Sequence, residues 1–135
     1  MTTNTTTKNV LRIAAVCLAA LLFCGVFCGA AAAGSNAAKI GDTEYPTVQA
    51  AVNAATSGDL VKMISDSTEC ITISKTITLD LAGFTLYGDG QGSVITVNAG
   101  GVLTLEDTSA GKTGKLTGGS AENGGGVYVN GGTFT

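Results

Sequence analysis

Short segments in which apolar and polar residues alternate fill the second half of the chain, and one pair of segments recurs. Ile71-Thr72-Ile73 and Ile77-Thr78-Leu79, joined by a polar turn, return as Ile95-Thr96-Val97 and Leu103-Thr104-Leu105. Alternation with a period of two predicts strands that each have one buried face. Self-similarity at a fixed spacing predicts repeated units that bury their apolar faces by stacking on neighbours.

The spacing also predicts a register. Ile71 should lie under Ile95, facing inward, while Thr72 and Thr96 face solvent. A third copy begins at Val127-Tyr128-Val129, in which the two valines should face inward and the tyrosine outward. Its second strand leaves two options open, because either Phe134 or its two threonine neighbours could point to the core. The longer gap before this copy predicts an insertion over residues 111–126.

Turn residues follow the apolar strands. Asn98 and Asn130 each come directly after a valine expected to face inward. Asparagines at the same corner of successive units can stack their amides and satisfy turn backbone groups, so we expect a structural role for both.

One amphipathic helix is predicted before the strands, over residues 46–56. Pro46 is suited to a first helical turn, and Val48, Ala51, Val52 and Ala55 fall on one face of a helix. Ahead of it, residues 39–45 could form one short strand with a turn at Gly41-Asp42. We therefore predict an all-β fold, a right-handed parallel β-helix (solenoid) with a short N-terminal capping α-helix.

The first 33 residues have the layout of a secretory signal peptide. Lys8 and Arg12 precede an uncharged apolar run, which ends in small residues. Cleavage is expected near Ala33 or Ala38, and a retained membrane anchor is the alternative. The predicted organisation is a signal peptide over 1–33, an N-terminal cap over 34–60, and β-helix coils over 61–135, truncated at an uncapped end where edge pairing is expected.

Charge and cysteine content narrow the function classes. The five lysines and ten acids that follow residue 33 give the exported part a net charge of −5, with no arginine or histidine. Scattered lysines without a basic stripe disfavour a nucleic-acid partner. Three of the four cysteines lie in the leader, so the exported part is not a disulfide scaffold, and Cys70 is expected to be a small buried apolar residue.

The segment Tyr45-Pro46-Thr47-Val48-Gln49, with its alanine-rich continuation and the later Gly58-Asp59, resembles the N-terminal cap of the pectin lyase-like superfamily of right-handed β-helix proteins. The glycine pairs at 124–126 and 131–132 are similar to the repeats of surface-displayed adhesins. This resemblance covers residues 40–135 and implies the fold, but no single activity, since the fold carries lyases, hydrolases and adhesins alike.

Catalytic chemistry has weak support in the sequence. Lyases of this superfamily use clustered aspartates with an arginine or lysine base, and the exported part has no arginine. Glycosidases need carboxylates at a defined separation. The acids that could serve are Asp66, Asp80, Asp89, Glu106, Asp107 and Glu122. Solvated turns are the more ordinary place for such acids, and Asp107 is expected to cap backbone amides after Leu105.

We therefore assign no catalytic, cofactor-binding or metal-binding residue, and expect no cofactor. The sequence favours a non-catalytic, secreted or cell-surface β-helix protein, an adhesin, spacer or scaffold that contacts glycan or a host or cell-surface protein. Membrane contact is expected only through an uncleaved leader. The alternative is the N-terminal part of a polysaccharide lyase or glycoside hydrolase whose catalytic residues lie beyond residue 135.

Overall fold

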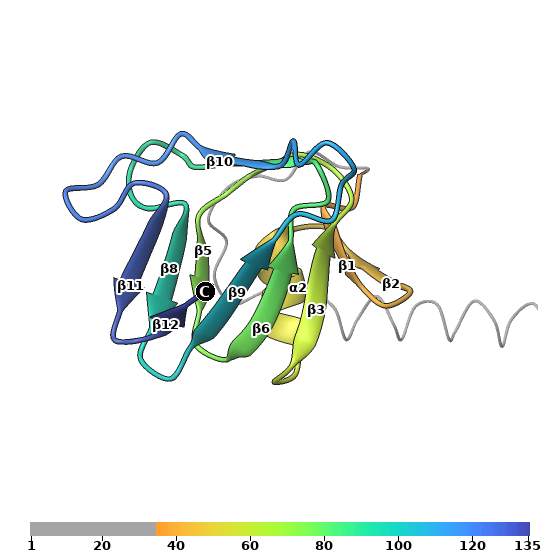
Figure 1. Ribbon diagram of the computed structural model, residues 1–135, viewed down its shortest axis with the longest axis horizontal. Helices are drawn as coiled ribbons and strands as arrows, with labels where there is room; N and C mark the ends of the chain where they lie inside the picture. Colours follow the sequence, from red (N-terminus) through yellow and green to blue (C-terminus); the bar gives the residue numbers. More distant parts are fainter. Residues whose placement is uncertain (1–34) are drawn as a thin grey trace, which may run out of the picture.

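The computed structural model describes residues 35–135, and strands dominate this part of the chain (Figure 1). In chain order the elements are β1 (Ala38–Ile40), β2 (Thr43–Tyr45), α2 (Val48–Ala54), β3 (Asp59–Met63), β4 (Ser67–Thr68), β5 (Ile71–Ile73), β6 (Thr76–Asp80), β7 (Thr85–Tyr87), β8 (Ile95–Asn98), β9 (Val102–Glu106), β10 (Lys115–Thr117), β11 (Val127–Asn130) and β12 (Thr133–Phe134). The signal peptide predicted over 1–33 lies outside the described residues. No helix within 35–135 is long and apolar enough to cross a membrane.

The strands form three sheets. A six-stranded sheet has the order β12-β9-β6-β3-β1-β2, and two three-stranded sheets have the orders β10-β7-β4 and β11-β8-β5. From β3 onward, every pairing between strands is parallel and joins a strand to the one three elements later in the chain. The chain therefore visits the three sheets in turn and returns to each beside its earlier strand (Figure 1).

The predicted register between repeats is confirmed. Ile71 pairs with Ile95 and Ile73 with Val97, and all four side chains are buried. Thr72 lies on the opposite, exposed face of its strand, as alternation requires. The third copy continues the same columns, because Val127 pairs with Ile95.

The open question about the second strand of the third copy is also settled. Phe134 pairs with Leu103, which is fully buried, so Phe134 lies on the core side of β12. It remains 43% exposed, because β12 is the edge strand of its sheet and no further strand covers it. The insertion predicted over 111–126 contains a strand of its own, β10, which pairs with β7.

The predicted fold class is wrong. A right-handed parallel β-helix would give parallel sheets, whereas the largest sheet here is mixed, beside two three-stranded parallel sheets. β1 pairs antiparallel with both β2 and β3. The cause lies in residues 38–45, for which the sequence predicts one short strand with a turn at Gly41-Asp42, whereas the structure has a hairpin of two strands. Ile40 pairs with Thr43 across those two residues, so the chain folds back and adds two antiparallel strands to the sheet.

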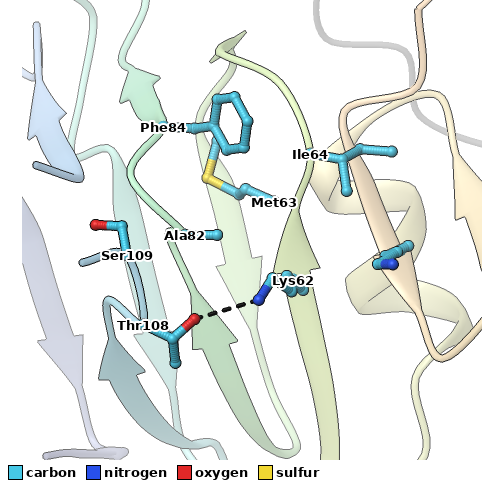
Figure 2. Close-up of a pocket in the computed structure, with 8 residues that line it drawn as sticks. Lys62, Met63, Ile64, Ala82, Phe84, Thr108 and Ser109 are labelled. Atoms are coloured by element: carbon cyan, nitrogen blue, oxygen red, sulfur yellow. Dashed lines mark hydrogen bonds between the residues drawn. The ribbon is translucent and has the colours of Figure 1, made fainter. Parts of the chain in front are cut away.

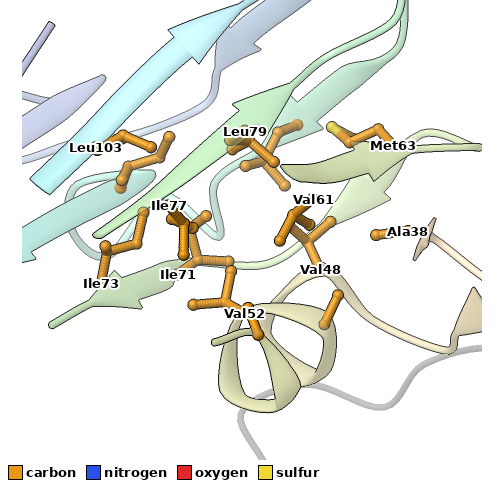
Figure 3. Packing of buried hydrophobic residues seen from close by; sticks show 14 of the residues in the cluster. Ala38, Val48, Val52, Val61, Met63, Ile71, Ile73, Ile77, Leu79 and Leu103 are labelled. Atoms are coloured by element: carbon orange, nitrogen blue, oxygen red, sulfur yellow. The ribbon is translucent and has the colours of Figure 1, made fainter. Parts of the chain in front are cut away.

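In the described part of the chain, one apolar cluster fills the space between the sheets and the helix. α2 covers one side of it, and the inward residues of β3, β5, β6 and β9 form the other (Figure 3). The labelled members are Ala38, Val48, Val52, Val61, Met63, Ile71, Ile73, Ile77, Leu79 and Leu103. Aliphatic residues at alternate positions of stacked strands supply this core, which explains how the chain folds with few aromatic residues.

The helix is shorter than predicted, because it begins at Val48 and ends at Ala54. Pro46 lies outside it. Thr47 keeps an extended backbone, with φ −135° and ψ 157°, and its hydroxyl accepts a hydrogen bond from the Ala50 N–H at 3.0 Å. Threonine is well suited to this N-cap position, and the cap fixes the start of the helix two residues later than proline alone would indicate.

Candidate functional site

A shallow groove of about 310 Å³ lies where β3, β6 and β9 end and the following turns begin (Figure 2). Its walls combine basic, hydroxyl and apolar side chains. The lining residues are Lys39, Lys62, Met63, Ile64, Ala82, Phe84, Thr108 and Ser109. Residues distant in the sequence meet here because the parallel strands place their carboxyl ends at one edge of the sheet.

A row of charged residues crosses the outer face of the sheet beside this groove. The strand register aligns Glu44 with Lys39, Lys39 with Lys62, Lys62 with Asp80, and Asp80 with Glu106. Two like charges directly opposite one another destabilise a sheet. Here Glu44 lies beside Lys39 and Asp80 lies beside Lys62, which offsets the repulsion between the two lysines. The row as a whole is not positively charged and does not favour an anionic ligand.

Asp80 is the buried member of the row. Its carboxylate accepts hydrogen bonds from the Ala82 N–H at 2.9 Å, the Thr108 N–H at 2.9 Å and the Thr108 hydroxyl at 2.6 Å. The Lys62 ammonium lies 3.3 Å from its Oδ2 atom and donates to the Thr108 hydroxyl oxygen at 3.2 Å (Figure 2). Asp80 therefore ties the turn after β6 to the turn after β9.

These contacts also set the charge of Asp80. Burial raises the pKa of its carboxyl, but the hydrogen bonds from Thr108, Ala82 and Lys62 outweigh burial and hold the pKa below 3.8. Asp80 is thus ionised near neutral pH. A carboxylate held ionised by four donors is a structural anchor and is poorly suited to donate a proton in catalysis.

The turn that carries Phe84 into the groove is strained. The Phe84 N–H donates to the Leu81 carbonyl at 2.8 Å, and both central residues have positive φ, 49° at Ala82 and 89° at Gly83. This is the geometry of a type I′ turn, which favours Asn or Gly at its first central position. An alanine there costs conformational energy, and the bonded Asp80 carboxylate holds it in place.

Asp107 has the capping role that the sequence predicts. Its carboxylate accepts from the Ser109 N–H at 3.0 Å and the Gly114 N–H at 2.7 Å. A hydrogen bond from the Ser109 side chain and these backbone donors, with Gly83, lower the pKa of Asp107 to about 2, against partial burial, which raises it. A Cβ at position 114 would lie 2.6 Å from the Leu81 Cβ atom, so glycine is required for this close approach.

The other candidate acids do not converge on the groove. Asp66 accepts from the Thr85 N–H at 2.7 Å, and Asp89 accepts from the Gln91 N–H at 2.9 Å. Glu106 lies beside Asp80 in register but is exposed, and Glu122 is exposed in the loop before β11. Asp80 and Glu106 are therefore the candidates that pair across adjacent strands, and only Asp80 is buried.

Cys70 differs from its expected role as a small buried apolar residue. It is half-buried, and its thiol donates to the Asp89 carboxylate at 3.2 Å. Within residues 35–135, no three His, Cys, Asp or Glu side chains are grouped so that they could hold a metal ion.

Two positioning residues were missed by the sequence reasoning. The Glu69 carboxylate accepts from the Val48 N–H at 2.8 Å and the Gln49 N–H at 2.9 Å, so it binds the first turn of α2. The Gln49 side chain accepts from the Thr72 N–H at 2.7 Å and donates to the Thr72 carbonyl at 3.2 Å. The Gln49 side chain thereby connects α2 to the backbone of β5. Gln49 lies in the first turn of α2 and in the segment that resembles a β-helix cap, which is a visible signal, whereas no sequence pattern marks Glu69.

No family model matches the chain, and comparison with the curated proteins and with the solved structures gave no match. The resemblance to the pectin lyase-like superfamily stays a prediction from sequence motifs. The fold and the site define the described part as a mainly β protein whose parallel strands stack in register and whose groove is shallow.

Proposed function

We propose that this chain is a non-catalytic exported protein that acts at the cell surface as an adhesin, spacer or scaffold and contacts glycan or protein. The observation that carries the proposal is that the buried or capping acids around the groove hold turns in place. Asp80 is buried with four donors and Asp107 caps a turn, so both are committed to structure. Thr72 on β5 and Thr117 on β10 are instead exposed polar side chains on strands and are open to a partner.

The described electrostatics support contact with a partner rather than turnover of a substrate. General acid–base catalysis needs a group whose pKa lies near the working pH. The pKa values of Asp59, Asp80, Asp89 and Asp107 are all shifted downward, away from that range. These four aspartates are therefore suited to fixing turns.

Cell fractionation with protease treatment of intact cells tests location, and incubation with a panel of polysaccharides tests catalysis. We expect the chain in the medium or on the outer surface, with its new N-terminus near residue 34 or 39, and no release of reducing ends or unsaturated products. A chain kept inside the cell, or turnover of any of these polysaccharides, would contradict the proposal.

A further inference from the structure

Tyr87 is an aromatic side chain that the fold presents to solvent. It lies on β7, where Leu86 points inward and is fully buried, so Thr85 and Tyr87 point outward. Tyr87 is 41% exposed, and its hydroxyl makes no hydrogen bond within residues 35–135. Its backbone is nonetheless fixed, because its carbonyl accepts from the Glu69 N–H at 2.8 Å. The ring is thus exposed on a rigid strand.

Threonines flank this ring on both sides. Thr68 of β4 and Thr117 of β10 are the register partners of Tyr87, so all three side chains share the outer face of the sheet. Neighbouring strands lie about 4.8 Å apart. Both threonines are exposed, and neither hydroxyl is engaged in a hydrogen bond among the described residues. Because β-branched side chains are stiff at χ1, these hydroxyls are held in place at little entropic cost. We call Thr68, Tyr87 and Thr117 the tyrosine face.

The surroundings of the tyrosine face are polar and have a net negative charge. Asp66 and Lys115 lie toward its N-terminal side, and Asp89 lies two residues beyond Tyr87. Two acids and one lysine leave the margin net negative, which disfavours an acidic ligand. Small free molecules bind mainly in concave pockets, and the groove described above does not include these three residues, so an extended partner suits this face better.

The strand arrangement disfavours a peptide as the occupant. β7 is the central strand of its sheet, and both of its edges are already paired, with β4 and with β10. A peptide therefore cannot bind at Tyr87 by adding a strand. A sugar ring has an apolar C–H face, which can cover the tyrosine ring, and hydroxyl groups at its rim, which can bond to the two threonines.

We propose that the tyrosine face binds a neutral, extended polysaccharide, with one sugar ring stacked on Tyr87 and hydrogen-bonded to Thr68 and Thr117. This inference rests on the proposed function, because it names the surface and the class of glycan through which an exported contact protein would act.

Co-sedimentation of the exported full chain with insoluble neutral polysaccharides tests the inference, with a glucan, a mannan and chitin as probes and polygalacturonate as the acidic comparison. We expect binding to at least one neutral polymer. Tyr87→Ala should weaken it about ten-fold or more, and Tyr87→Phe should retain most of it because the ring remains. Thr68→Val and Thr117→Val, which keep the shape and remove the hydroxyl, should each weaken binding a few-fold.

Leu60→Ala is the matched control, since Leu60 is 44% exposed on a different sheet and its replacement should leave binding unchanged. Far-UV circular dichroism of each variant separates lost binding from lost folding. Absence of binding to every neutral polymer, preference for polygalacturonate, or unchanged binding by folded Tyr87→Ala would overturn the inference. A surface-located chain that fails these assays refutes the tyrosine face alone, whereas a chain found inside the cell refutes the proposed function.

Discussion

At the scale of single residues, Ala82 and Gly83 occupy the same turn, but its backbone conformation strains the alanine and suits the glycine. Both have positive φ, which an alanine adopts only at a cost of about 1–2 kcal/mol. Ala82→Gly removes that strain but adds unfolded-chain entropy of about 0.5–1 kcal/mol. We expect the free energy of unfolding from urea titration to rise by up to about 1 kcal/mol.

Gly83→Ala is the companion substitution in this turn. Its new Cβ atom would lie 3.1 Å from the Ser109 Cβ atom and from the Thr113 Oγ1 atom, in a backbone conformation that disfavours alanine. The same titration should show a loss of about 1–2 kcal/mol. If Ala82→Gly destabilised the protein as much as Gly83→Ala does, the turn geometry described above would be wrong.

Asp80 and Asp107 predict how stability depends on acid. The folded-state pKa of each lies below 3.8, and that of Asp107 is about 2, so the unfolded chain binds more protons in this range. Their stabilising effect is complete above roughly pH 5 and is lost as the pH falls through the folded-state values. We expect the urea midpoint to drop between about pH 4 and pH 2.

Asp80→Asn and Asp107→Asn should each flatten this pH profile and lower the midpoint at neutral pH. Glu122→Gln is a suitable comparison, because Glu122 is exposed in the loop before β11. A profile equally steep in Asp107→Asn and in the unaltered chain would show that this carboxylate does not contribute in the manner described.

At the scale of elements, the seven-residue helix α2 depends on side chains that lie outside it. Helices this short are not stable alone, so caps and packing must hold α2 in place. Glu69, which is 8% exposed, binds two N–H groups of its first turn, and Lys75 donates to the carbonyls of Asn53 and Ala55 near its end at 3.0 and 2.7 Å. The connections before and after β5 thus cap both ends of α2.

Glu69→Ala should therefore destabilise the protein by roughly 1–3 kcal/mol, because it leaves buried helix donors without an acceptor. Hydrogen exchange should show faster exchange at Val48 and Gln49 than in the unaltered chain. Glu44→Ala removes an exposed acid whose side chain, within residues 35–135, bonds only to the Asn36 side chain, and its effect should stay within about 0.5 kcal/mol. Equal losses for the two variants would contradict the capping role of Glu69.

The glycine pairs between strands also have a physical reason at this scale. A Cβ at Gly101 would lie 2.6 Å from the Ile73 carbonyl oxygen, and one at Gly132 would lie 2.6 Å from the Asn98 carbonyl oxygen. The stacked corners therefore approach so closely that only glycine fits. Asn130 donates its side-chain amide to that of Asn98 at 3.5 Å, which agrees with the predicted amide stacking at this corner.

At the scale of the whole molecule, the sequence predicted contacts between repeats better than it predicted the fold. Alternation and a constant spacing determine which side chains align, so the pairing of Ile71 with Ile95 could be foreseen. The antiparallel hairpin could not, because each of its strands is only three residues long, too short for alternation to identify. The sharing of Asp80 between two turns depends on strand register and loop conformation together, and no local pattern carries that information.

The tyrosine face likewise cannot be predicted from any local sequence pattern. Thr68, Tyr87 and Thr117 are spread over 50 residues and belong to no recognisable motif. They become neighbours only because β4, β7 and β10 pair in parallel register. The proposed contact surface therefore depends on the same parallel stacking as the repeat. A different strand register would remove both the alignment of the repeats and this surface.

The alignment of successive repeats can be measured directly with paired cysteines in a full-length chain whose four native cysteines are replaced by serine. Thr72 and Thr96 are register partners on an outer face, and the Cα separation of such partners is suitable for a disulfide. We predict near-complete oxidation of Thr72→Cys/Thr96→Cys, seen as a shift on non-reducing gels. Thr72→Cys/Thr104→Cys, which joins different sheets, should not crosslink within one molecule. Failure of the first pair to oxidise in the folded protein, or equal oxidation of the second, would contradict the stacked register on which the account depends.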